Sequence, residues 1–293
     1  MESRLARLVI KGGSALTLLF LYTPLVVLAV YAFNKSRFRA WPPDLWTVRW
    51  FSAAWHDPQL PTALAGSVEA AVGATLVALL LGSLAAFAVH RFHFFGREGI
   101  SFALVLPIAL PGIVTAIALS SAINFGHDLF GLTFSIWTII VGHATFCIVV
   151  VFNNVVARLR RTPTSLVEAS MDLGADGWTT FRHITFPAVR TAFLAGALLA
   201  FGLSFDEIVV TNFTAGPKLT LPIWIFNNIR TPQQQPIVNA VALVLMVISI
   251  VPVYFAQRLA GGAEAIGSGA RGRETEGASE DTTAAAVVAA GPG

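Results

Sequence analysis

The chain has 293 residues, of which 55% are hydrophobic and only 12% are charged, and its mean hydropathy is +0.71. Soluble domains carry about 25% charged residues, so this composition excludes an ordinary water-soluble fold and indicates a chain solvated by lipid. The net charge of +3 fits arginines on the cytoplasmic side of a membrane, and no aromatic-interleaved basic motif points to nucleic acid. One cysteine, Cys147, gives no support to a disulfide, redox or zinc role.

Residues 1–11 carry three basic side chains and precede an apolar run that continues to Phe33. The run is too long for the core of a signal peptide, and no small-x-small cleavage site follows it. We therefore expect it to be retained as the first membrane helix, behind a short cytoplasmic N-terminus.

Six segments reach the length of about 20 apolar residues that a membrane-spanning helix needs. Their predicted ranges are 12–33, 64–89, 100–125, 129–156, 187–213 and 236–257. The fold class that we predict is therefore all-α, a polytopic transmembrane bundle of six helices within a domain 12–257. Pro24, Pro107 and Pro111 fall inside these spans, where neighbouring helices can satisfy the backbone groups that proline leaves unpaired.

The basic residues predict the orientation of the spans. With the N-terminus inside, 13 of the 19 basic residues fall in cytoplasmic segments, and the cluster Arg158, Arg160 and Arg161 is the strongest signal. The remaining six lie in outer loops: Lys35, Arg37, Arg39, Arg49, Lys218 and Arg230. We expect a multi-pass protein of the cytoplasmic membrane with both termini and the loop 157–186 cytoplasmic, and residues 34–63 and 214–235 outside.

The second span carries small residues at spacings of three and four, including Gly66, Ala70, Ala74 and Gly82. Small residues let helices approach closely in lipid, so this stripe predicts a helix-packing face. Residues 258–293 consist mainly of Gly, Ala, Ser, Thr and scattered charges, a composition that predicts a disordered cytoplasmic tail.

The loop 157–186 between the fourth and fifth spans is long enough to need an explanation. Ser165 and Glu168 have the S-x-x-E spacing of a capping box, and Gly174 can end the helix with a positive φ. A second short helix can begin near Asp176 and is expected to end before Pro187. The loop is predicted to be a helix–turn–helix at the membrane surface, which by pattern alone fits a lipid-surface element as well as a partner-docking element.

The spacing of particular residues in this loop favours the second alternative. Glu168-Ala169-Ser170, then Gly174, then Ile184 and finally Phe186-Pro187 resembles the signature of binding-protein-dependent ABC permeases, which reads Glu-Ala-Ala, glycine four positions on, and Ile-x-Leu-Pro. The sequence departs from that signature at Ser170 and Phe186, and both changes keep the size or the apolar character of the residue. The resemblance covers roughly residues 10–258.

The resemblance implies the permease of a type I ABC importer, in which this loop is the coupling helix that docks on an ATPase subunit. It also implies three kinds of partner: a second permease subunit, an ABC ATPase dimer and an extracytoplasmic solute-binding protein. No Gly-x-x-x-x-Gly-Lys-Ser/Thr motif occurs in the chain, so no cofactor is expected here, and ATP and Mg²⁺ are expected in the ATPase. The chain itself is then not an enzyme. For Glu168, a role in capping alone stays open beside partner contact.

The fifth span points to a class of solute. It contains Ser204-Phe205-Asp206-Glu207, followed by Asn212-Phe213, Gly216-Pro217 and Leu221-Pro222-Ile223. This string resembles the second membrane subunit of the spermidine/putrescine permeases, which implies a polyamine, although permeases for iron(III), thiamine and opines share parts of it.

Carboxylates inside a membrane usually face an aqueous path or a partner. Asp206 and Glu207 are expected near the outer end of the fifth span, and Glu69 at a similar depth in the second, where three acids would suit a cationic solute. Because adjacent residues of a helix point about 100° apart, one of Asp206 and Glu207 could instead have a structural role.

The histidines do not predict a metal or catalytic site. His90 and His93 lack a third ligand nearby in sequence, and His143, inside the fourth span, is expected to make a helix–helix hydrogen bond. A secondary transporter would need inverted repeats, and a membrane-embedded enzyme would need a base or metal beside the outer acids. We found neither feature in the sequence.

Overall fold

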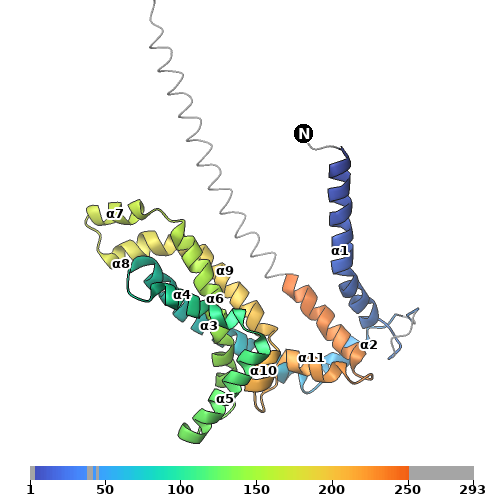
Figure 1. Ribbon diagram of the computed structural model, residues 1–293. Coiled ribbons are helices and arrows are strands. Elements are labelled where there is room, and N and C mark those ends of the chain that lie inside the picture. The colour runs from blue at the N-terminus through green and yellow to red at the C-terminus, as the bar shows by residue number, and fades with distance from the viewer. Residues whose placement is uncertain (1–3, 38–41, 44–45, 251–293) are drawn as a thin grey trace, which may run out of the picture. The chain divides into compact units, whose positions relative to one another are not determined.

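The computed structural model describes residues 4–37, 42–43 and 46–250 (Figure 1). Its elements are α1 (Arg4–Ala32), α2 (Arg49–Trp55), α3 (Leu60–Arg91), α4 (Arg97–Ala109), α5 (Gly112–Phe130), α6 (Ile136–Arg160), α7 (Thr164–Asp172), α8 (Gly177–Thr180), a π-helical segment η1 (Phe181–Thr185), α9 (Phe186–Phe205), α10 (Val209–Thr214) and α11 (Leu221–Ile229). A further helix covers Gln235–Ile250. The predicted all-α class is confirmed.

Five helical stretches are long and apolar enough to cross a membrane. They are Arg7–Ala32, Leu60–Arg91, Gly112–Phe130, Ile136–Arg160 and Gly177–Phe205. The sixth predicted span, 236–257, is described only as far as Ile250, as a shorter apolar helix. The chain divides into two units, Met1–Ile248 and Ser249–Gly293, and the predicted tail 258–293 lies outside the described residues.

Helices α3, α6 and α9 pack against one another and form the core of the first unit (Figure 1). Ala74, Ala78 and Ala86 of α3 are fully buried against Val151 and Val155 of α6. A Cβ atom added to Gly82 would lie 2.8 Å from the carbonyl oxygen of Ile148, so only glycine allows this approach of α3 to α6. The predicted packing face of small residues is thus confirmed.

The predicted third span, 100–125, is not one continuous helix. Helix α4 ends at Ala109, Leu110 and Pro111 are extended with ψ of 145° and 130°, and α5 begins at Gly112. Proline has no N–H to donate, and it disfavours the helical conformation of the residue before it, so Leu110 leaves the helix. Pro107 and Pro24, in contrast, stay within their helices.

The start predicted for the fourth span, residue 129, was also wrong. Helix α5 continues to Phe130, and Gly131 then adopts a φ of +69° that ends it. Helix α6 begins at Ile136, where the hydroxyl of Thr138 accepts a hydrogen bond from the Ser135 N–H. The apolar run of the sequence extends across this turn and hides it, because glycine and serine are common in membrane helices as well.

The predicted fifth span, 187–213, breaks near its end. Helix α9 ends at Phe205, Asp206 to Ile208 are not helical, and the short helix α10 follows. A second short helix, α11, lies in the segment predicted as an outer loop, and it contacts α3. In Figure 1, α10 lies near the opposite end of α6 from α7, and the hydroxyl of Thr138 donates to the carbonyl oxygen of Thr214 over 2.8 Å.

Candidate coupling loop and solute path

The N-cap of α7, the first helix of the loop 157–186, lies two residues before Ser165, the N-cap that the capping box predicted. This N-cap is Pro163 with an extended ψ of 131°, the first helical residue is Thr164, and the cap carries no side-chain hydrogen bond. The predicted capping box of Ser165 and Glu168 was therefore wrong, because both residues lie inside the helix. Pro163 fixes the φ of the residue before the helix. The first N–H groups of α7 have no side-chain cap and face solvent, since no residue of α7 is buried.

The end of α7 is the glycine turn that the sequence predicted. Gly174 has a φ of +85°, its N–H donates to Met171 over 2.9 Å, and the Ala175 N–H donates to the Ser170 carbonyl over 3.1 Å. These two bonds define a Schellman motif, which needs a left-handed residue at the glycine position. A Cβ on Gly174 would meet no atom within 4 Å, so the turn requires glycine for its backbone conformation and not for space.

Helix α8 begins next to the predicted Asp176, whose carboxylate caps it by accepting the Thr179 N–H over 3.0 Å. The hydrogen bonds from the side chain and backbone of Thr179 hold the pKa of Asp176 below its usual value.

The predicted end of this helix before Pro187 was wrong, since the chain runs through η1 into α9 as one apolar helical stretch, Gly177–Phe205. Within it, the Phe186 N–H bonds to the Phe181 carbonyl, five residues back. We attribute the continuity to this wider turn, because proline fits poorly inside a regular α-helix and π turns relax the spacing.

Ser170, the first departure from the permease signature, contacts α8. Its hydroxyl lies 3.1 Å from the hydroxyl of Thr180, which is buried. The pair connects the two short helices across the Gly174 turn. Of the other sequence-predicted residues, Glu168 and Ala169 are exposed on α7, Ile184 is half-buried in η1, and Pro187 is exposed in the first turn of α9.

The coupling loop carries four large apolar side chains that are exposed. No residue of α7 is buried, and Leu166, Met171, Leu173 and Trp178 are exposed, Leu173 by 89% and Trp178 by 66%. Large apolar side chains left exposed in this way are typical of a region that a partner covers. Glu168, two residues after Leu166, is also exposed but lies on another face of α7.

Aromatic rings lead from this surface to the long helices. We call them the aromatic ladder: Trp178, Phe181, Phe186, Phe193 and Phe87. Trp178 stacks on Phe181 at 5.7 Å between ring centroids, and Phe181 meets Phe87 of α3 edge to face at 5.6 Å. Phe186, the second departure from the signature, lies between Phe181 and Phe193, at 6.1 and 5.8 Å. Sequence reasoning identified only Phe186 of these residues.

His143 of α6 makes the helix–helix hydrogen bonds that the sequence predicted, and they hold the break between α9 and α10. Its Nδ1 lies 2.7 Å from the Ser204 hydroxyl and its Nε2 lies 2.8 Å from the Thr211 hydroxyl, and all three side chains are buried. Because Thr211 donates its single hydroxyl proton to the Glu207 carbonyl, its oxygen must accept from His143. A neutral His143 therefore carries its proton on Nε2 and accepts from Ser204 at Nδ1.

The two acids of this break have different surroundings. The Glu207 carboxylate is half-buried and accepts the Val210 N–H over 2.9 Å, which caps α10. Asp206 is exposed, and its carboxylate makes no hydrogen bond or ion pair with the described residues. Glu69 is likewise exposed on α3 and free of such bonds within the described part. No contact between described residues joins these three carboxylates directly.

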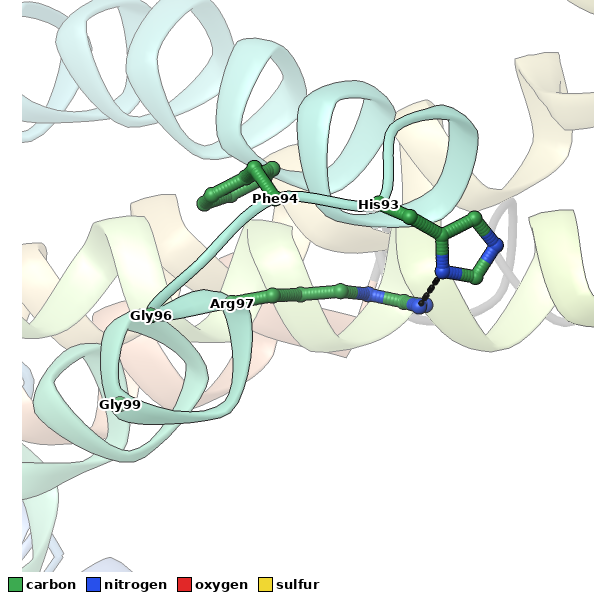
Figure 2. A pocket seen from close by; sticks show the side chains of 5 residues that line it. All are labelled: His93, Phe94, Gly96, Arg97 and Gly99. Carbon is green, nitrogen blue, oxygen red and sulfur yellow. Dashed lines mark hydrogen bonds between the residues drawn. The ribbon is translucent and has the colours of Figure 1, made fainter.

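Within the described ranges, no group of three or more His, Cys, Asp or Glu residues could hold a metal ion. A cavity of about 340 Å³ lies at the turn between α3 and α4, where Arg97 donates to Nδ1 of His93 over 3.2 Å (Figure 2). A second cavity, of about 430 Å³, lies between α6 and α9 and is lined by Asn153, Asn154, Arg158, Arg161 and Thr191, with three alanines.

Comparisons with known proteins agree with the loop signature. Residues 78–262 match the family described as "Binding-protein-dependent transport system inner membrane component". The chain is 34% identical to the spermidine/putrescine transport system permease protein PotC of Escherichia coli (strain K12), covering 87% of this chain and 95% of that protein. It is 36% identical to the putrescine transport system permease protein PotI of the same strain, covering 78% and 82%.

Solved structures share the fold. A chain of a bacterial ABC transporter that imports the acidic polysaccharide alginate matches with a TM-score of 0.67 at 15% identity, covering 88% of this chain and 98% of that one. A chain of the MetNI methionine ABC transporter matches with a TM-score of 0.53 at 15% identity, covering 71% and 93%.

Proposed function

The chain belongs to the family of binding-protein-dependent transport system inner membrane components and is a permease subunit of an ABC importer, and from this premise we propose that it moves a small polycation, spermidine or putrescine, into the cytoplasm. The observation that carries the proposal is the identity of 34–36% to two polyamine permeases over most of the chain. The fold alone does not select a solute, since an importer of an acidic polysaccharide shares it.

The complex would contain a second permease subunit, an ABC ATPase dimer and an extracytoplasmic solute-binding protein, surrounded by lipid. ATP and Mg²⁺ would be bound by the ATPase, so this chain would need no cofactor and catalyse no covalent step. The exposed apolar side chains of α7 and α8 support this assignment, because a surface of this kind needs a covering partner. Glu168, exposed on another face of α7, can pair with a basic side chain of the ATPase.

In this proposal the coupling loop, residues 157–186, moves with the ATPase, and the permease alternates between inward-facing and outward-facing states. The chain contains elements suited to transmitting this movement. The Schellman turn at Gly174 and the Ser170–Thr180 contact connect α7 to α8. The aromatic ladder then joins α8 to α9 and α3. A push on α7 would thus reach two of the three core helices through packed side chains.

For the topology, we propose that both termini and the coupling loop are cytoplasmic. The cluster Arg158, Arg160 and Arg161 at the end of α6 supports it, since short cytoplasmic loops are rich in arginine. Asp206, Glu207 and Glu69 then lie toward the outer side. There Asp206, exposed at a helix break, is suited to meet a cation that arrives from outside, while Glu69 lines the same outer region.

The experiment that tests the function is uptake by the complete complex in proteoliposomes, with the binding protein supplied on the outside. We expect ATP-dependent accumulation of labelled putrescine or spermidine. Iron(III), thiamine and an opine serve as alternative solutes in parallel vesicles. Uptake of one of these with no uptake of polyamine would reject the proposed solute while keeping the importer, whereas ATP-independent uptake would reject the importer itself.

A further inference from the structure

The cavity between α6 and α9 has a composition that the transport cycle does not require. It is an open groove of about 430 Å³, and most of the residues that line it are exposed. Two guanidinium groups, Arg158 and Arg161, line it together with the amides of Asn153 and Asn154 and the hydroxyl of Thr191. No acidic residue of the described part of the chain lines it, so the cavity is suited to an anion.

Most of its polar groups are available to a ligand. Within the described residues, the side chains of Asn153, Arg161 and Thr191 make no hydrogen bond or ion pair. Toward the described residues, Arg158 uses only its Nε, which donates to the Ala188 carbonyl of α9 over 2.8 Å. Asn154 uses one amide proton on Val150, at 2.8 Å. Polar groups left unpaired at the edge of a membrane are costly unless water, lipid or a partner pairs them.

The polar groups of the cavity follow an order along α6 and α9, counted from the coupling-loop end of each helix. Arg161 follows the last turn of α6, Arg158 lies about one turn before it along the helix, and Asn154 lies another turn before that on the same face. At about 1.5 Å per residue, Arg161 and Asn153 are separated by about 12 Å along the helix. On α9, Thr191 is followed one turn deeper by Ala195, and then by the exposed Leu198 and Leu199. Cationic, neutral polar and apolar groups therefore follow one another from the surface inward.

A phospholipid has the same order of groups: an anionic phosphate, a glycerol backbone with ester carbonyls, and acyl chains. We propose that this cavity binds the headgroup of an anionic phospholipid from the leaflet next to the coupling loop. The phosphate lies between Arg158 and Arg161, the glycerol esters accept hydrogen bonds from Asn153 and Thr191, and an acyl chain follows Ala195 toward Leu198. Basic pockets between membrane helices are suited to such headgroups. The identity of this leaflet as the cytoplasmic one rests on the proposed topology.

The position of the cavity gives the lipid a consequence for transport. It joins the end of α6, where the coupling loop begins, to the start of α9, where the loop ends. A bound headgroup bridges these two helices, as the Arg158–Ala188 hydrogen bond already does. The lipid therefore restrains the end of α6 and the start of α9, the two helix ends that flank the coupling loop. The ATPase activity of the complex should then depend on anionic lipid.

The test uses the complete complex in nanodiscs of phosphatidylcholine with or without phosphatidylglycerol, with retained lipid counted by native mass spectrometry. Arg161→Gln should lower phosphatidylglycerol retention about fivefold, as expected for one arginine near an anionic headgroup. Arg160→Gln is the matched control, because Arg160 is adjacent and exposed but does not line the cavity. Thr191→Val keeps every charge and should also lower phosphatidylglycerol retention. It gives a second, independent test of the cavity if Arg161→Gln fails to fold.

Four results would overturn the proposal. Equal retention in the wild type and Arg161→Gln means that no lipid is bound at this cavity, and equal losses in Arg161→Gln and Arg160→Gln mean diffuse surface charge. Loss of the second permease subunit from Arg161→Gln means that a protein partner occupies the cavity. Thermal stabilisation by inorganic phosphate alone, in phosphatidylcholine and dependent on Arg161, means a site for a soluble anion. None of these readouts depends on the solute, so they are independent of the polyamine assignment.

Discussion

The ring of Phe181, in the coupling loop, meets the ring of Phe87 on α3 edge to face, with 5.6 Å between their centroids. Edge-to-face pairs place the positive edge of one ring on the negative face of the other. This arrangement stabilises the pair by about 0.5–1.5 kcal/mol in addition to the free energy gained by burying the ring surfaces. Through this contact the loop touches a helix that is remote from it in sequence. The coupling loop is thus joined to the core by side-chain packing as well as by the chain itself.

The first prediction concerns this contact. Phe181→Leu removes the ring contacts to Phe87, Trp178 and Phe186 and keeps an apolar side chain. We expect the complex to assemble and hydrolyse ATP, with stimulation by the loaded binding protein reduced severalfold. Phe201→Leu is the matched control, because Phe201 is half-buried in α9 and, among the described rings, stacks on Phe205 alone. A similar loss of stimulation in both variants would show that general loosening of α9, and not the ladder, is responsible.

The ladder also shows where sequence reasoning stops. The signature residues from Glu168 to Pro187 could be identified by spacing, and Gly174 by the conformation that its turn requires. Phe181 and Phe186 are five residues apart, a step that a 3.6-residue period does not place on one face. The π turn of η1 brings them together, and nothing local in the sequence announces a π turn.

The second prediction tests the turn after α7. Gly174→Ala places a Cβ on a residue with a φ of +85°, which costs about 1–2 kcal/mol although no atom lies within 4 Å of that Cβ. Gly177→Ala also has open space for its Cβ, but its φ is not positive. We expect faster hydrogen exchange across α7 and weaker ATPase stimulation in the first variant only. Gly174→Val should uncouple transport more strongly, and full stimulation in that variant would reject a coupling role for the turn.

The third prediction concerns topology. In a Cys147→Ser background, Asp172→Cys on α7 should be labelled by an impermeant thiol reagent only after the cells are opened. Lys218→Cys should be labelled in intact cells. Both positions are exposed, so the comparison measures sidedness and not burial. Labelling of Asp172→Cys from outside intact cells would contradict the proposed orientation and favour the opposite one.

The fourth prediction tests the hydrogen bonds that hold the break between α9 and α10. His143→Phe leaves the buried hydroxyl of Ser204 without its partner and removes a donor to Thr211, so we expect a loss of stability of about 1–3 kcal/mol. Ser204→Ala should cost less in the wild type and almost nothing in His143→Phe, because the shared bond is already absent. Thermal unfolding in detergent measures both, and strictly additive losses would contradict a direct His143–Ser204 interaction.

The helix break itself could not be predicted from the sequence. Residues 187–213 read as one apolar helix, because Ser204 and Thr211 are tolerated in membrane helices when they find partners. The partner is His143, which is 61 residues from Ser204 in sequence, so the feature that holds the break is tertiary. The acidic pair Asp206 and Glu207 was the only local sign of an unusual position.

The last prediction separates these two acids. The Glu207 carboxylate caps α10 through the Val210 N–H, whereas the Asp206 carboxylate is exposed and has no hydrogen-bond or ionic partner among the described residues. Asp206 is therefore the acid that is free to meet a cationic solute. Asp206→Asn keeps the shape and removes the charge, and a charged hydrogen bond contributes about 1.5–3 kcal/mol. We expect the KM for polyamine uptake to rise about tenfold or more, with assembly and basal ATPase activity unchanged.

Glu207→Gln is the matched control, because an amide oxygen can still accept the Val210 N–H and keep the cap. It should leave the KM for uptake within about twofold of the wild type, which is well below the change that loss of a solute contact produces. Glu69→Gln, measured in the same vesicles, reports whether the acid of α3 also contributes to the path. Wild-type KM values in all three variants would reject the acidic path. Failure of Asp206→Asn to assemble would instead mean that the Asp206 carboxylate contacts the second permease subunit, because loss of a structural acid disrupts the complex, whereas loss of a solute-binding acid lowers the affinity for solute.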